Sequence, residues 1–182
     1  MLKAMEQMAF LNRKVLAVTR FASRAKFKLD SETIETDLPG FLTDYIEQIA
    51  RTAGSVRLQI DVVNEHPGMK MRFKPIDASI IVDNLVSNAK RAKASNIKFE
   101  LTPVDKRGLL IRATDNGRGL PPGTNKTRIF EMGYTTTLGS GLGLYHVRQV
   151  LGEIGGSIEL DNSEGQKGTT FVMTIIPSGR KS

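Results

Sequence analysis

Apolar residues recur at helical spacing in four stretches of the chain. In residues 1–27 they alternate at spacings of three and four, which forms an a/d seam of the kind that packs in helical bundles. This seam favours a helix that pairs with another chain over a long helix that packs on its own domain. The other three helices are predicted at residues 38–53, 75–93 and 142–154. Asp37 is a suitable N-cap for the first of these, and Pro75 a suitable first residue for the second.

Alternating apolar and polar residues predict the strands between these helices. Residues 56–62 form the clearest case, and the turn signal at 64–68 predicts that they pair as a hairpin with residues 69–74. The remaining strands are predicted at residues 97–102, 108–113, 157–160 and 169–176. Local hairpins mixed with helices favour a two-layer α/β sandwich, a mixed sheet packed on helices, over a doubly wound parallel sheet.

The domain organisation follows from this pattern. Residues 1–27 are predicted to form a dimerisation-type helix, 28–37 a linker, and 38–178 the folded domain. The linker is short and charged. The chain begins inside a heptad pattern, which suggests that it is part of a longer protein.

Composition narrows the possible chemistry. The 182 residues include no cysteine and only two histidines, which excludes disulfides and thiolate sites and disfavours a zinc centre. No apolar run is long enough to span a bilayer, so we expect no membrane contact by this chain. The net charge of +7 is spread along the sequence with few aromatic residues, so nucleic acid is not the expected partner. A mildly basic surface also suits a protein that handles polyphosphate.

The helix predicted at 75–93 carries polar residues on one face. Asn84, Asn88 and Arg91 follow one another at spacings of four and three, so their side chains share a face. Amide oxygens are hard, neutral ligands for Mg²⁺, which takes its other ligands from water and phosphate. A guanidinium beside them would bind phosphate. Taken alone, the pattern also fits solvated or structural amides.

Two glycine-containing segments follow. Asp115 comes directly after a predicted strand and is followed by Gly117 and Gly119, so a carboxylate could accept a hydrogen bond from adenine while the backbone passes close to the ring. In isolation the segment also fits a tight turn. The second segment contains Gly139, Gly141 and Gly143-Leu144 and leads into a helix, whose first amides and dipole favour anions.

In this order and spacing the three segments resemble the asparagine box and the two glycine boxes of Bergerat-fold (GHKL) ATPases. The resemblance spans roughly residues 38–178 and is strongest for the catalytic domain of sensor histidine kinases. It implies that ATP and Mg²⁺ are the cofactors, that Asn88 holds the metal, that Arg91 reaches the phosphates and that Asp115 binds adenine. It further implies a lid between the glycine boxes. The implied nucleotide contacts are Asn84, Asn88, Arg91, Asp115, Gly117, Gly119, Thr137, Gly139, Gly141, Gly143, Leu144 and Thr169.

One position separates the branches of this superfamily. Hydrolytic members carry a glutamate four residues before the metal-binding asparagine, as general base on water. Here that residue is Asn84, which cannot accept a proton at neutral pH. Asp83 lies about 100° further round the helix, so it is poorly placed to act as the base instead. The resemblance therefore implies a protein-histidine kinase, with Asn84 and Arg91 as the catalytic residues.

The same resemblance implies partners that this chain lacks. No helix carries a phosphoacceptor motif, and His66 and His146 are predicted to be structural, so the acceptor histidine would lie outside this chain. The expected partners are a histidine-bearing helix, a second copy through the N-terminal helix, and a response regulator. The expected location is cytoplasmic, with the full-length protein compatible with a membrane anchor. Two alternatives remain: a nucleotide-gated interaction module (a degenerate kinase) and a hydrolytic Bergerat-type ATPase.

Overall fold

A five-stranded mixed sheet forms one layer of the fold. The computed structural model describes residues 33–52, 58–105, 108–134, 141–161 and 167–176. The strand order is β2-β4-β5-β7-β6, in which β2 and β4 are parallel and the other neighbours antiparallel. The strands are β2 (Gln59–Asn64), β4 (Asn96–Val104), β5 (Gly108–Asp115), β6 (Gly156–Leu160) and β7 (Thr169–Ile175).

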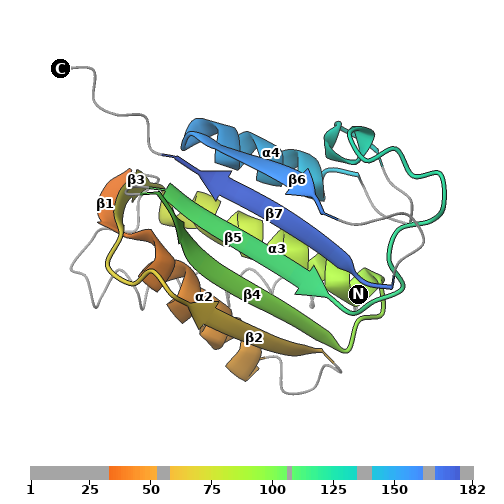
Figure 1. Ribbon diagram of the computed structural model, residues 1–182, viewed down its shortest axis with the longest axis horizontal. Coiled ribbons are helices and arrows are strands. Elements are labelled where there is room, and N and C mark those ends of the chain that lie inside the picture. Colours follow the sequence, from red (N-terminus) through yellow and green to blue (C-terminus); the bar gives the residue numbers. More distant parts are fainter. Residues whose placement is uncertain (1–32, 53–57, 106–107, 135–140, 162–166, 177–182) are drawn as a thin grey trace, which may run out of the picture.

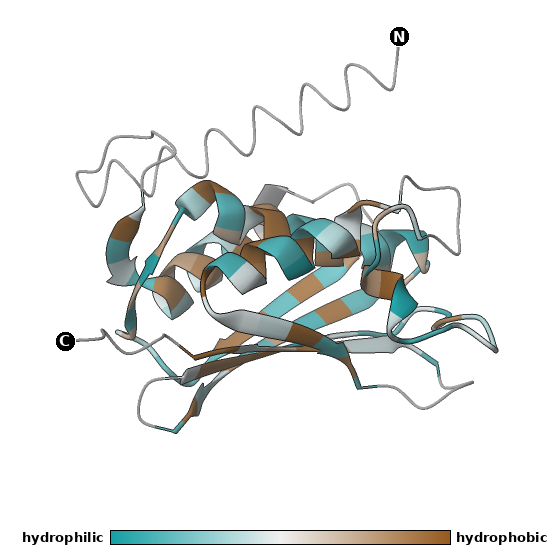
Figure 2. Ribbon diagram, turned by 90° about the horizontal axis from the view of Figure 1, so that it is seen from above, coloured by the Kyte–Doolittle hydropathy of each residue, from teal (hydrophilic) through white to brown (hydrophobic). Residues whose placement is uncertain are grey.

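Helices form the second layer and lie on one face of the sheet (Figures 1 and 2). In the described residues these are α2 (Leu38–Thr52), α3 (Pro75–Arg91) and α4 (Gly143–Glu153), with one turn of 3₁₀ helix, η1 (Arg128–Phe130). The predicted two-layer α/β sandwich is confirmed. The helix predicted at residues 1–27 lies outside the described residues. No helix of the described part has both the length and the apolar character to cross a membrane.

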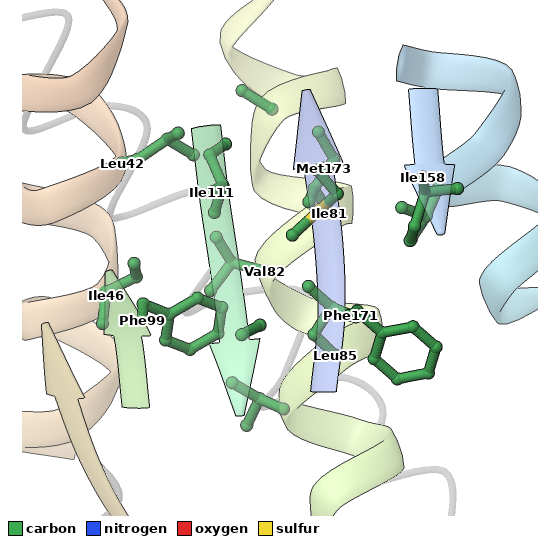
Figure 3. Packing of buried hydrophobic residues seen from close by; sticks show 14 of the residues in the cluster. Leu42, Ile46, Ile81, Val82, Leu85, Phe99, Ile111, Ile158, Phe171 and Met173 are labelled. Carbon is green, nitrogen blue, oxygen red and sulfur yellow. The ribbon is translucent and has the colours of Figure 1, made fainter. Parts of the chain in front are cut away.

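The core lies between the two layers because each strand alternates and each helix has an apolar stripe. In β4, Ile97, Phe99 and Leu101 are buried, whereas the residues between them are partly exposed. They belong to one buried cluster with Ile46 of α2 and Leu85 of α3, and Figure 3 shows Phe99 within this cluster. This packing fixes α3 against the sheet, and so determines which of its polar residues face away from the core.

The predicted hairpin of residues 56–62 with 69–74 is wrong. β2 pairs in parallel with β4, whereas β3 (Lys70–Phe73) leaves the sheet and pairs antiparallel with β1 (Ile34–Asp37). The chain does turn between β2 and β3, but Gly68 has a φ of +87° and its N–H bonds Asp37, which directs β3 to β1. The strand β1 also differs from the prediction, because the sequence pattern predicts a linker over residues 28–37.

Asp37 is the N-cap of α2 that the sequence predicts, and it has a second role. One carboxylate oxygen accepts the Gly40 N–H at 3.0 Å, and the other accepts the Gly68 N–H at 3.0 Å. A Cβ at position 40 would lie 2.3 Å from Oδ2 of Asp37, so a larger residue there would displace this carboxylate. The one side chain therefore joins the start of α2 to the turn between β2 and β3.

We expect Asp37→Ala to lower the free energy of unfolding by about 1–2 kcal/mol, because it removes a helix cap and a turn contact together. Urea unfolding followed by circular dichroism measures this. Asp37→Asn keeps one acceptor oxygen, so its free energy of unfolding should lie between those of the unsubstituted chain and Asp37→Ala. An alanine variant that unfolds at the same urea concentration as the unsubstituted chain would contradict the double role.

Candidate functional site

A pocket of about 110 Å³ opens between the C-terminal half of α3, the loop after β5 and the start of α4. In Figure 1 these segments meet at the end of the sheet where β5 ends and β7 begins. The lining residues are Asn88, Arg91, Ala92, Asp115, Arg118, Gly119, Leu120, Pro121, Ile129, Tyr134, Gly141, Gly143, Leu144, Thr169 and Phe171. The structure thus brings together residues from all three of the segments that the sequence singles out.

The two asparagines of α3 have different surroundings. Asn88 lines the pocket half-buried, and its amide has no hydrogen-bond partner among the described residues. Asn84 is not a lining residue: its Nδ2 donates to the Ile80 carbonyl at 2.8 Å. Its Oδ1 lies where a Cβ on Gly143 would come within 2.9 Å, so Asn84 packs on the first residue of α4. Within the described part of the chain, Asn88 therefore has a whole amide without a partner at the pocket, whereas Asn84 does not line the pocket and packs between α3 and α4.

Asp83 faces away from this pocket. Its buried carboxylate accepts hydrogen bonds from the Tyr45 hydroxyl of α2, at 3.0 Å to each oxygen. Burial raises the pKa of Tyr45, and the charge and hydrogen bond of Asp83 raise it further. Asp83 therefore joins α2 to α3 and lines no part of the pocket, in agreement with the prediction that it is poorly placed to act as a base.

Asp115 ends β5 inside the pocket and is 6% exposed. One of its oxygens accepts the Gly117 N–H at 2.8 Å, and Thr169 of β7 donates to the carboxylate from its hydroxyl and its backbone. Burial raises the pKa of Asp115, and these three hydrogen bonds offset part of that rise. A carboxylate held in this way keeps acceptor capacity for one more donor inside the pocket.

The raised pKa of Asp115 predicts a stability change with pH. The ordinary value is 3.8, so as pH rises the unfolded chain loses this proton before the folded chain does. Folding stability from this group is therefore present below 3.8 and falls as pH rises through the folded pKa. Because the amide in Asp115→Asn does not titrate, the unfolding free energy of the unsubstituted chain minus that of the variant should fall with rising pH. Urea unfolding of both proteins between about pH 3 and pH 7 tests the sign, and a difference that rises with pH would contradict it.

The loop after Asp115 is hydrogen-bonded to the C-terminal end of α3. The Arg118 N–H donates to the Ala92 carbonyl at 3.0 Å, and the Gly168 N–H donates to the Gly117 carbonyl at 2.8 Å. A Cβ on Gly117 would lie 2.6 Å from Cβ of Ala92, so only glycine allows this approach. Gly117 is thus part of the wall behind the pocket and does not line it, whereas Gly119 does.

The start of α4 forms the opposite wall. Gly141 has a φ of +68°, and a Cβ there would lie 2.4 Å from the backbone carbon of Gly133. The Gly133 N–H also donates to the Gly141 carbonyl at 3.2 Å. The N-cap residue is Leu142, whose side chain has no acceptor atom, so the first amides of the helix depend on other acceptors. An anion is a suitable acceptor at a helix N-terminus.

The sequence did not predict every lining residue. The lining residues that were not among the predicted contacts are Ala92, Arg118, Leu120, Pro121, Ile129, Tyr134 and Phe171, although Arg118 lies within the Asp-x-Gly-x-Gly segment. Position inside that segment was the available signal for Arg118. The hydrophobic residues come together only in the fold, where the Phe130 and Phe171 rings pack edge to face at 6.3 Å between centroids. The predicted contacts Thr137 and Gly139 lie outside the described residues.

Comparison with known sequences identifies similar proteins. Residues 73–179 match the family of Histidine kinase-, DNA gyrase B-, and HSP90-like ATPases. The chain is 34% identical over 116 residues to a probable C4-dicarboxylate sensor kinase of Bacillus subtilis, covering 58% of this chain and 21% of that protein. It is 31% identical over 136 residues to the sensor-type histidine kinase PrrB of Mycobacterium bovis, covering 72% and 30% respectively. The chain therefore spans about a fifth to a third of the length of these curated relatives.

Solved structures with the same fold include two from sensor kinases. The ATP-binding domain of PrrB from Mycobacterium tuberculosis superposes with a TM-score of 0.63 at 24% identity, covering 82% of this chain and all of that chain. Full-length ShkA in complex with AMPPNP superposes with a TM-score of 0.68 at 20% identity, covering 97% of this chain and 37% of that chain. At these identities the likeness establishes the fold, which is that of histidine kinase catalytic domains.

Proposed function

Because the chain belongs to the Histidine kinase-, DNA gyrase B-, and HSP90-like ATPase family, we propose that it is the Mg-ATP-binding catalytic domain of a sensor histidine kinase. It would transfer the γ-phosphate of ATP to a histidine outside this chain. The observation that carries the proposal is the pocket itself, which combines the buried carboxylate of Asp115 with the amide of Asn88 and the cation of Arg91. The two curated relatives compared above are both named as sensor kinases.

Adenine would bind at Asp115. Its amino group is a donor that matches the remaining acceptor capacity of the carboxylate, and Leu120 and Ile129 supply apolar surface for the ring. Gly119, with a φ of +75°, lets the loop after β5 bend around this end of the pocket. The phosphates would then run toward the first amides of α4.

The residues present fit Mg²⁺ held mainly by the nucleotide. No group of three or more His, Cys, Asp or Glu side chains gathers as a metal site in the described part of the chain. The free amide of Asn88 supplies one hard oxygen ligand, which suits an ion that keeps water and phosphate oxygens around it. Mg²⁺ bound there with ATP would neutralise phosphate charge.

The described part of the site has no base at the position from which hydrolytic members of the superfamily activate water. Asn84 occupies the position of the hydrolytic glutamate and cannot accept a proton at neutral pH, and Asp83 is hydrogen-bonded to Tyr45 on the far side of α3. Such a site suits transfer to an acceptor that is already a good nucleophile, such as an imidazole. Arg91 and Asn88 would position and neutralise the phosphates. A response regulator and a second copy of the protein complete the proposed signalling system.

The test is phosphoryl transfer to a supplied acceptor. The chain is incubated with Mg²⁺, γ-labelled ATP and separately prepared dimeric helix bundles that carry the phosphoacceptor histidines of sensor kinases. We expect acid-labile, alkali-stable label on a bundle, and none on the matched bundle whose histidine is replaced by glutamine. Steady phosphate release without any bundle would instead establish a hydrolytic ATPase. Nucleotide binding with neither activity would establish a nucleotide-gated interaction module.

A further inference from the structure

The pocket has two distinct ends along α3. At one end Asn84 packs on Gly143, the first residue of α4. At the other end Ala92, the C-cap of α3, accepts the backbone hydrogen bond of Arg118. These two positions are eight residues apart, which corresponds to ~12 Å along a helix axis. A nucleotide lying along α3 would therefore have one end at α4 and the other at the loop after β5.

The chemistry of the two ends differs. The start of α4 is a helix N-terminus, which favours phosphate. The loop end holds Asp115, whose buried carboxylate is unsuited to phosphate and suited to the amino group of a base. On the proposed function, the base lies at the loop end and the phosphates at the α4 end.

Two arginines line this pocket, and they belong to different ends. Arg91 and Arg118 are both exposed, and neither guanidinium has an ion-pair or hydrogen-bond partner within the described residues. Side chains on a helix lean toward its N-terminus, so Arg91 is directed back along α3 toward Asn88 and the phosphate end. Arg118 is held at the base end by its hydrogen bond to Ala92.

We propose that Arg118 binds the base end of the nucleotide, with its guanidinium plane against the adenine ring, and that it is not a phosphate ligand. A planar, weakly hydrated guanidinium stacks on an aromatic ring, whereas a lysine ammonium at the same place does so poorly. Leu120 and Pro121, which lie close after it in the sequence, line the same pocket and add apolar surface beside the ring. The role rests on the proposed function and adds a contact that determines affinity for the base.

The experiment compares ligands with different numbers of phosphates. Arg118→Met keeps the length of the side chain without its charge or plane, and Arg118→Lys keeps the charge alone. Dissociation constants for ATP with Mg²⁺, ADP and adenosine are measured by displacement of a fluorescent ATP analogue, corrected for the affinity of each variant for that analogue. We expect Arg118→Met to weaken all three ligands by a similar factor of roughly 3 to 10. Arg118→Lys should recover little of this loss.

Two further variants serve as controls, one at the phosphate end of the pocket and one outside it. Arg91→Met should weaken ATP most and adenosine least, because its partner is phosphate. Arg148→Met removes an exposed arginine of α4 that does not line the pocket, and should leave all three affinities unchanged.

The proposal is overturned if the effect of Arg118→Met increases with the number of phosphates, shrinks in high salt and is restored by lysine, since Arg118 would then be a phosphate ligand. It is also overturned if Arg118→Met changes no affinity while the unsubstituted chain binds ATP. If the unsubstituted chain binds none of the ligands, the proposed function fails, and this role fails with it.

Discussion

Asp115→Asn is expected to weaken ATP binding by roughly 10- to 150-fold, the effect of removing a hydrogen bond to a buried charged group. A carboxylate has acceptor sites on two oxygens, and the backbone N–H of Gly117 and the donors of Thr169 already use part of them. An amide has a single acceptor oxygen. If the asparagine oxygen stays with Gly117 and Thr169, its NH₂ group faces the amino group of adenine, and two donors oppose each other.

Calorimetric titration with a non-hydrolysable ATP analogue, with and without Mg²⁺, measures this loss. A circular dichroism spectrum equal to that of the unsubstituted chain shows that the variant is folded. Asp161→Asn is a suitable control, because Asp161 forms an exposed ion pair with Arg112 and lies outside the pocket. If the unsubstituted chain and Asp115→Asn bind the analogue with equal affinity, Asp115 does not bind adenine. The proposal that this pocket binds ATP would then lose its main support.

The helices of the described domain could be predicted from sequence because their signals are local. Helices predicted at 38–53, 75–93 and 142–154 are observed at Leu38–Thr52, Pro75–Arg91 and Gly143–Glu153. Two of the boundaries carry a local sequence signal: Asp37 accepts the Gly40 N–H at the start of α2, and Pro75 is the first residue of α3. The strand pair formed by β4 and β5 was predictable for the same reason, since the two strands are neighbours in sequence.

Strand pairing between distant segments was not predictable in this way. β2 and β3 are also neighbours in sequence and are separated by a turn, yet each pairs with a different strand. The whole of α3 lies between β2 and β4 in the sequence, and no residue of β2 predicts that these two strands pair in parallel. Leu58 and Ile60 are buried in the same core cluster as the apolar face of α2, a tertiary contact that the alternation within residues 56–62 does not reveal.

In the candidate site, too, some residues could be predicted from the sequence and others could not. Asn88, Arg91 and Asp115 were identifiable because their residue types and spacing resemble a known pattern, and all three line the pocket. Phe171 and Leu120 were not, because apolar residues in a strand or loop look the same whether they face a core or a ligand. Asn84 was identified by the pattern as a contact, whereas the structure places it between α3 and α4.

Gly168→Ala is expected to lower the free energy of unfolding by about 3 kcal/mol or more, a large part of the total for a domain of this size. Gly168 has a φ of +82°, and a Cβ there would lie 2.2 Å from the backbone oxygen of Asp115. Both the unfavourable φ and the overlap oppose an alanine. Relief of the overlap requires the ends of β5 and β7 to separate, which would disturb the Gly168–Gly117 hydrogen bond and the contact of Thr169 with Asp115.

Variants at two other glycines separate the cost of the unfavourable φ from the cost of the steric overlap. Gly123 has a φ of +75° with nothing within 4 Å of an added Cβ, so Gly123→Ala should lose only the backbone part, about 1–2 kcal/mol. Gly152 lies in α4, also without a close contact, and Gly152→Ala should raise stability by up to about 1 kcal/mol. Urea unfolding of the three variants should therefore rank them Gly152→Ala, Gly123→Ala, Gly168→Ala in decreasing stability. If Gly168→Ala were no less stable than Gly123→Ala, the ends of β5 and β7 would separate without loss of stability. The close contact of Gly168 with Asp115 would then not be what holds this end of the pocket together.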